Sequence, residues 1–384
     1  MKHSITLLVI IITFLSYGIT YGQKQESKNK KNKYTVEKIV HPGTLHSLDD
    51  LDYIKKHVND SDEPWASAYK KMLAWKGSSL DWEPTPFKHV HRDSYGANRV
   101  GDPAISNDGS SAYSHALQWY ITGDTAHAEK TITILNAWAN TIETITGKDD
   151  NLIAGMLAQK YCNAAEIIRY TYDKWPQQEI EQFENMLMTV FYPLISNYYT
   201  NSMNSNGNWG LSMVNSVMTI AVFCDDVDLF NNAIAHVTGT ERQPYSTFSG
   251  YIDAETGQCQ ESGRDQGHPQ MGLGYLGAIC EIAWKQGIDL YSYLDNRLLH
   301  GLEYHAKYNL GYDVPYYNMY GKYKDTIATK NRGKFDFIYE RAYNHYVNRQ
   351  HLSMPYTKQV IEKIRPEGYT SSMTSWGTLT SYHD

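Results

Sequence analysis

The stretch DGSSAYSHALQWYITGDTAHAEKTITILNAWANTI, residues 108–142, predicts two helices joined by a tight turn. Apolar residues recur at spacings of three and four on both sides of Gly123, as they do in amphipathic helices. Glycine adopts the left-handed backbone conformation that often ends a helix, so we expect Gly123 to close the first one. A connection this short makes the two helices antiparallel neighbours.

The same helical pattern continues along the chain. Ser47 is the expected N-cap of an earlier helix, and helices of about 15 to 22 residues are predicted within 151–172 and 177–199. Strand patterns appear only locally, at 245–260 and 371–382. We therefore predict an all-α fold, an α/α toroid in which paired antiparallel helices surround a central cleft, with minor local β structure.

The ends of the chain predict an exported protein with one domain. Residues 1–22 run from a charged start through an apolar core to small residues, in the order of a signal peptide. Residues 23–38 form a polar, basic leader, and 39–384 are expected to form a single toroid domain. No other apolar run approaches the roughly 20 residues that span a bilayer. We expect a periplasmic or secreted monomer.

Composition excludes some partners and favours others. The formal net charge of −7 excludes the broad basic face that nucleic-acid binding requires. The 32 tyrosines and 9 tryptophans suit carbohydrate binding, although most of them are expected in the core. Dispersed spacing of Cys162, Cys224, Cys259 and Cys280 predicts buried thiols, with one disulfide as the alternative. No metal or cofactor is expected.

The stretch ESGRDQGHPQMGLGYLG, residues 261–277, contains a glycine pattern that resembles a dinucleotide-binding loop. Such a loop needs a strand before it, and none leads into Gly272, Gly274 and Gly277. Proline favours the first helical position, so a helix is expected to begin at Pro269. The glycines then become packing positions inside that helix.

His268 precedes the predicted helix start, where the positive end of the helix dipole favours a neutral imidazole. A neutral imidazole can accept a proton. Arg264 and Asp265 lie on the same approach, so we predict a cluster of charged groups beside a cleft. In the alternative interpretation, Arg264 only pairs with Asp265 or Glu261 and His268 only caps the helix.

The stretch NGNWGLSMVNSVM, residues 206–218, contains asparagines directly before an apolar helix. They could be N-caps, or an amide could bind an acidic sugar while Trp209 stacks on its ring. The stretch resembles the motif N-N-H-S-Y-W-A-A-W-S-V-M of alginate lyases. When the shared S-V-M is aligned, the family's carboxylate-neutralising Asn falls on Asn208 and its His falls on Trp209.

Further segments between about residues 39 and 368 resemble the alginate lyase-like superfamily of exported bacterial proteins, among them ESGRDQGH, YNLGYDVPY and YERAYNHYVNR. The resemblance implies an α/α toroid lyase that cleaves 4-linked uronic acid polymers by β-elimination without a metal. Asn208 would neutralise the substrate carboxylate, Arg264 would add a cationic contact and His268 would be the base. Tyr308 is the expected acid, and a tyrosine that serves as both acid and base is the alternative to His268. The substrate-binding candidates are Trp209, Arg99, Tyr304, His345, Arg349 and Tyr275.

Several alternatives stay open at this stage. Mannuronate-rich alginate is the favoured substrate, and glucuronan is the next choice. A glycoside hydrolase would need two opposed carboxylates, for which Glu261 with Asp265 or Asp108 with Asp253 could be nominated. A non-catalytic polysaccharide-binding protein would instead use aromatic side chains as a platform, among them Trp119. A satisfied core histidine is the alternative for His345.

Overall fold

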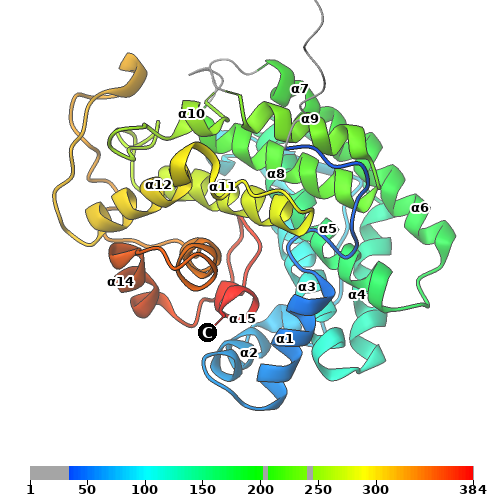
Figure 1. The fold of residues 1–384 in the computed structure, drawn as a ribbon. Coiled ribbons are helices and arrows are strands. Elements are labelled where there is room, and N and C mark those ends of the chain that lie inside the picture. Colours follow the sequence, from blue (N-terminus) through cyan, green and yellow to red (C-terminus); the bar gives the residue numbers. More distant parts are fainter. Residues whose placement is uncertain (1–33, 202–205, 240–244, 384) are drawn as a thin grey trace, which may run out of the picture.

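The computed structural model describes residues 34–201, 206–239 and 245–383 of the 384-residue chain. The predicted signal peptide, 1–22, lies outside the described residues. Helices dominate the fold, which confirms the all-α prediction (Figure 1). The helices are α1 (Leu48–Asn59), α2 (Trp65–Leu73), α3 (Asp102–Thr122), α4 (Thr125–Ala139), α5 (Asp150–Thr171), α6 (Gln177–Met186), α7 (Tyr192–Asn201), α8 (Gly207–Phe223), α9 (Val227–Val237), α10 (Phe248–Tyr251), α11 (Gly267–Lys285), α12 (Tyr293–Asn309), α13 (Tyr339–Tyr343), α14 (Pro355–Ile364) and α15 (Gly377–Ser381).

The hairpin predicted in residues 108–142 is present as α3 and α4. Gly123 ends α3 with a φ of 74°, in the left-handed region. Asp124 then caps α4, because its side chain accepts a hydrogen bond from the N–H of Ala126. Ser47 caps α1 in the same way and forms a capping box with Asp50.

In the described part of the chain, four helices form the inner layer: α3, α5, α8 and α11 contact one another in that order. All residues of α8 except Trp209 are buried, and the helix carries no charged side chain. Outer helices α4, α7, α9 and α12 pack against the inner ones. Because outer helices return the chain between them, the inner helices run in the same direction. This layered pairing is the predicted α/α toroid.

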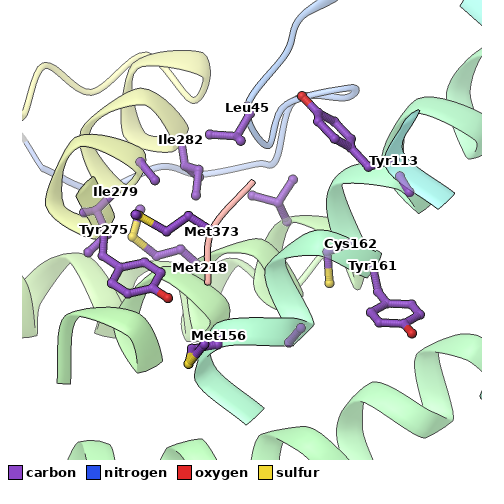
Figure 2. Close-up of a cluster of buried hydrophobic side chains, with 14 of the residues drawn as sticks. Leu45, Tyr113, Met156, Tyr161, Cys162, Met218, Tyr275, Ile279, Ile282 and Met373 are labelled. Carbon is purple, nitrogen blue, oxygen red and sulfur yellow. The ribbon is translucent and has the colours of Figure 1, made fainter. Parts of the chain in front are cut away.

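The C-terminal segment, residues 365–376 between α14 and α15, completes the core between the inner helices. Figure 2 shows Met373 from this segment beside Met218 of α8 and Tyr275 of α11, with Met156 of α5 close to them. Their exposed fractions are all 8% or less. Methionine is unbranched and flexible, so it fills the irregular space where helices meet a non-helical segment. Residues near the C-terminus are thereby packed against the bodies of α5, α8 and α11.

The strands differ from those predicted. The described residues contain β1 (His89–Arg92), β2 (Arg99–Val100) and β3 (Thr144–Thr146), in the sheet order β2-β1-β3. β1 is antiparallel to β2 and parallel to β3. All three lie outside the predicted strand regions.

Strands predicted at 245–260 and 371–382 are wrong. The first region contains α10 and one isolated bridge, between Ile252 and Cys259, and the second contains α15. Hydroxyl side chains compete for backbone groups and favour caps, as the Thr247 hydroxyl does when it accepts from the N–H of Gly250.

The cysteines are free thiols, as predicted, so the disulfide alternative is wrong. Cys162, Cys259 and Cys280 are buried, and Cys224 is partly exposed. Burial raises the pKa of the Cys162 thiol well above its usual value. Among the described residues, no helix combines the length and the hydrophobicity that a membrane span requires.

Gly272, Gly274 and Gly277 lie inside α11, so the cofactor interpretation is excluded and the packing interpretation holds for two of them. A Cβ at Gly272 would lie 2.0 Å from the Tyr251 hydroxyl oxygen, and one at Gly274 would lie 2.6 Å from Ile338. A Cβ at Gly277 would meet no atom of the described residues within 4 Å.

Substitution of these glycines tests their packing role. We expect Gly272→Ala to lower the free energy of unfolding by about 1–3 kcal/mol, because the added methyl group overlaps Tyr251. Gly277→Ala is the matched control and should stabilise the helix by up to about 1 kcal/mol, since alanine is the better helix former. Urea unfolding of both variants measures the difference. Equal stability of the two variants would contradict the packing argument.

Candidate active site

A cavity of about 440 Å³ opens where the first turns of α3, α5, α8 and α11 meet. Its volume falls in the range of small-molecule sites. Arg92 of β1 and Arg99 of β2 line one part of it, and the C-terminal segment lines another. Asn208, Trp209 and His268, which the sequence analysis selected from two separate stretches, line the same cavity.

The inner helices make this cavity a favourable place for an anion. Each helix N-terminus carries the equivalent of roughly half a positive charge, and the N-termini of the inner helices all open here. Arg92 and Arg99 also line the cavity, and both are paired with Asp102. The helix ends therefore favour an anion in this cavity, in a chain whose net charge is −7.

His268 lies in the first turn of α11, which begins at Gly267, two residues earlier than predicted. The helix begins there because one carboxylate oxygen of Asp265 accepts from the N–H groups of Gly267 and His268, both at 2.9 Å. The other oxygen lies 2.7 Å from His268 Nδ1. His268 is therefore fixed by the same residue that caps its helix.

Asp265 sets the tautomer of His268. Burial alone would raise the pKa of Asp265, but the hydrogen bonds from His268 outweigh burial and lower it to about 2. An ionised carboxylate only accepts hydrogen bonds, so Nδ1 of His268 carries the proton. The His268 side chain is 33% exposed, and its Nε2 is the ring nitrogen that does not contact Asp265.

Glu261 connects Asn208 to Arg264. The Asn208 side-chain nitrogen donates to both carboxylate oxygens of Glu261, at 2.6 and 2.7 Å, and its backbone N–H donates at 3.1 Å. Arg264 Nη1 donates to the same carboxylate at 2.9 Å. Glu261 itself is 0% exposed. Arg264 does not line the cavity and lies behind Asn208, in the pairing that the alternative interpretation foresaw.

The contact with Glu261 also orients the amide of Asn208. Because an ionised carboxylate accepts hydrogen bonds, the nitrogen of Asn208 faces Glu261 and the oxygen faces away. Asn208 Oδ1 is buried and has no hydrogen-bond partner among the described residues. The sequence analysis expected Asn208 to neutralise a substrate carboxylate, whereas its amide nitrogen is bound to Glu261 in the structure.

The structure does not bring the predicted tyrosines to the cavity. Tyr308 is 3% exposed, and the guanidinium of Arg332 lies over its ring at 4.0 Å. The Tyr304 hydroxyl donates to the carbonyl of Pro315 at 2.7 Å. Tyr275 is fully buried beneath the C-terminal segment. Helical spacing placed these side chains on buried faces, but those faces pack in the core and not in the cleft.

His345 and Arg349 also lie apart from the cavity. His345 is 1% exposed and stacks on Tyr291 with a centroid distance of 3.8 Å. Arg349 contacts the carboxylate of Glu281 at 3.4 Å. Burial lowers the pKa of His345 to about 4, so the side chain is a neutral core histidine.

Tyr369 is a cavity residue that the sequence analysis missed. Its hydroxyl donates to Asn107 Oδ1 at 2.7 Å, and burial raises the pKa of the phenol, which stays protonated at neutral pH. It comes from the C-terminal segment, far from the inner helices in sequence. The sequence signal that could have identified Tyr369 is its position in an irregular stretch, between Gly368 and several hydroxyl residues, because functional residues are frequent in such stretches.

The carboxylates nominated for a hydrolase are engaged elsewhere. Glu261 and Asp265 bind the groups described above. Asp108 is 0% exposed and accepts from two tryptophan indoles, and Asp253 accepts from a tyrosine hydroxyl. Among the described residues, Asp102 is the one carboxylate that lines the cavity, and it is paired with two arginines. Opposed free carboxylates are therefore not present in the described cavity.

A metal and an aromatic platform receive no support from the described residues. They contain no group of three or more His, Cys, Asp or Glu side chains placed to hold a metal ion. Trp119 lies near the C-terminal end of α3, whereas Trp209 lies in the cavity at the N-terminal end of the inner helices. The two tryptophans therefore do not form one surface.

Solved structures resemble this fold at low sequence identity. Alginate lyase A1-III from Sphingomonas species A1 is 14% identical, with a TM-score of 0.64, and the match covers 87% of this chain and 95% of that chain. A variant of A1-III complexed with a tetrasaccharide has 14% identity, a TM-score of 0.66 and coverage of 90% and 97%. An alginate lyase from Bacteroides ovatus has 14% identity, a TM-score of 0.61 and coverage of 90% and 100%.

Family membership comes from the sequence. No curated protein sequence matches the chain. The sequence profile described as "Alginate lyase" matches residues 20–313, which is most of the chain. This chain therefore belongs to the alginate lyase family of polysaccharide lyases, as the motif around Asn208 indicated.

Proposed function

We propose that the protein cleaves 4-linked uronic acid polymers by β-elimination, with mannuronate-rich alginate as its substrate. The observation that carries the proposal is the cavity in which the inner helix N-termini, Arg92 and Arg99 surround His268, whose Nδ1 is bound to Asp265. Each uronate unit carries a carboxylate, which suits this positive potential. The tetrasaccharide bound by the A1-III variant supports an oligosaccharide ligand for this fold.

His268 is the base in this proposal. The proton at C5 of the uronate is weakly acidic, so its removal needs a base and a neutralised carboxylate at C6. Nε2 of His268 takes the C5 proton, and the carboxylate of Asp265 stabilises the imidazolium that forms. The positive helix ends and the arginines stabilise the negative charge that develops on the C6 carboxylate.

Tyr369 is the acid. As the C5–H bond breaks, its electrons form the C4=C5 double bond and the bond between C4 and O4 breaks. The phenol of Tyr369 is protonated at neutral pH and donates its proton to the departing O4. Asn208, which lines the cavity, orients the ring.

The apolar side of the cavity suits the C–H face of a sugar ring. Met156 and Leu157 of α5, Trp209 of α8 and Met271 of α11 line it. Rings and aliphatic side chains pack against sugar C–H groups while polar groups bind the hydroxyls. Trp209, which stands at the position of the family's histidine, is therefore a binding residue in this proposal.

Ultraviolet absorbance of the new C4=C5 double bond tests the reaction directly. We expect absorbance to rise when the protein is mixed with poly-mannuronate, and to rise less with poly-guluronate and glucuronan. Reducing ends released without absorbance would assign a hydrolase. Binding without either product would assign a non-catalytic protein, and the fastest rate on glucuronan would change the substrate but keep the reaction.

A further inference from the structure

Lys160 is a buried amine on α5, one helical turn after the cavity residue Met156. It is 1% exposed. Its Nζ donates to the Ser110 hydroxyl at 2.9 Å and to the backbone carbonyls of Ser371 and Thr370 at 2.8 and 3.2 Å. A lysine this deeply buried needs a specific reason, because lysine is almost never fully buried without a charged partner.

The amine lies directly beneath the cavity. Ser106 and Ser371 line the cavity, and both contact Lys160 Nζ, Ser106 through its hydroxyl at 3.4 Å. The ring of Tyr369, a third lining residue, is 5.7 Å from Nζ. One layer of side-chain and backbone atoms therefore separates the amine from any ligand in the cavity.

No carboxylate neutralises Lys160 within the described residues. Its contacts are hydroxyls and carbonyls, which are neutral. On α3, Asp102 is paired with arginines and Asp108 is bound to indoles, and α8 carries no charged residue. In the C-terminal segment, burial raises the pKa of Glu367 to about 8, so that carboxyl is largely neutral at pH 7. His268 is the titratable group of α11 that lines the same cavity.

We propose that the Lys160 amine is the cationic group beneath the uronate-binding cavity, and that binding of a substrate carboxylate is coupled to protonation of this amine. This inference rests on the proposed function, because the missing counter-charge is the carboxylate of the polymer. A buried ammonium without a counter-ion is costly, and an anion in the cavity removes part of that cost. Lys160 therefore does not touch the ligand, and it favours binding by electrostatic attraction.

The coupling has a definite sign. Burial lowers the pKa of Lys160 to about 7, so near neutral pH the free protein holds the amine partly deprotonated. A bound carboxylate favours the ammonium and raises this pKa. Affinity should therefore be constant below pH 7 and fall by up to about tenfold per pH unit above it, until the pKa of the complex is reached.

Calorimetric titration of the full chain with a mannuronate tetrasaccharide tests the coupling. The His268→Ala background slows turnover and removes that side chain from the cavity. At pH 8, in two buffers of different ionisation enthalpy, we expect uptake of close to one proton per ligand. Lys160→Met should abolish both the uptake and the pH dependence. Lys174→Met, an exposed lysine beyond the far end of α5, is the matched control and should change neither.

Each outcome decides the inference. Absence of proton uptake in the His268→Ala protein would overturn the inference. This result does not depend on whether a Lys160 variant folds. Equal uptake with and without Lys160 would overturn it too, and Lys160→Gln serves as a second variant. If the wild-type enzyme cleaves the polymer while either result is obtained, only this inference fails. Loss of binding together with absence of cleavage would reject the proposed function as well.

Discussion

Replacement of His268 by alanine is expected to lower kcat on poly-mannuronate by about 10²- to 10⁴-fold, the usual contribution of a general base. The imidazole is held by Asp265 at 2.7 Å with Nε2 free for the substrate, so alanine removes the proton acceptor and leaves the cavity intact. His268 is part-exposed at a helix start, and its loss should change the unfolding temperature little. Initial rates of absorbance increase, measured at saturating polymer, give the effect.

Two further variants sharpen this prediction. His300→Ala, an exposed histidine on α12, is the matched control and should retain wild-type activity. Tyr369→Phe removes the proposed acid but keeps the ring, so it should lower kcat while His268 still binds Asp265. Activity of His268→Ala within about threefold of wild type, far below the contribution of a general base, would show that another group removes the C5 proton.

Replacement of Asn208 by alanine is expected to lower kcat/KM by about 10²- to 10³-fold, as the loss of a positioned polar group in an active site does. The change removes the amide that is proposed to orient the ligand. It also takes two side-chain hydrogen bonds from Glu261, a carboxylate that is 0% exposed. A buried group left short of partners costs about 1–3 kcal/mol, so stability should fall as well.

Asn215 provides the matched control for this prediction. It lies two turns later on the same helix, is 1% exposed, and neither atom of its amide has a hydrogen-bond partner among the described residues. Asn215→Ala should therefore keep full activity and should not lower the unfolding temperature. Equal activity of Asn208→Ala and Asn215→Ala would remove Asn208 from the proposed site.

The sequence predicted those parts of the fold that depend on local signals. Helical spacing and the glycine at position 123 identified the α3–α4 hairpin, because a helix end is decided by a few neighbouring residues. The same holds for Asn208 and His268, which stand in the first turns of α8 and α11. Helix starts are recognisable from sequence, and in this fold the helix starts line the cavity.

Positions that depend on distant packing could not be predicted. Tyr308 and Tyr304 share the apolar spacing of a buried helix face, and spacing does not distinguish a face in the core from one in the cleft. Tyr369 reaches the cavity because the C-terminal segment folds back against α3 and α5, for example through the hydrogen bond between Tyr369 and Asn107. No local pattern encodes a contact across that many residues.

The convergence of helix starts has a consequence for how such enzymes diverge. Each inner helix is anchored by its buried body, as α8 is by every residue after Trp209. A first-turn residue that is not buried, as Trp209 is not, can therefore be exchanged with less effect on the scaffold than a buried one such as Asn208. Trp209 in place of the family's histidine is an exchange of this kind. New substrate preferences can thus arise one cavity-lining side chain at a time, with little loss of folding stability where that side chain is not buried.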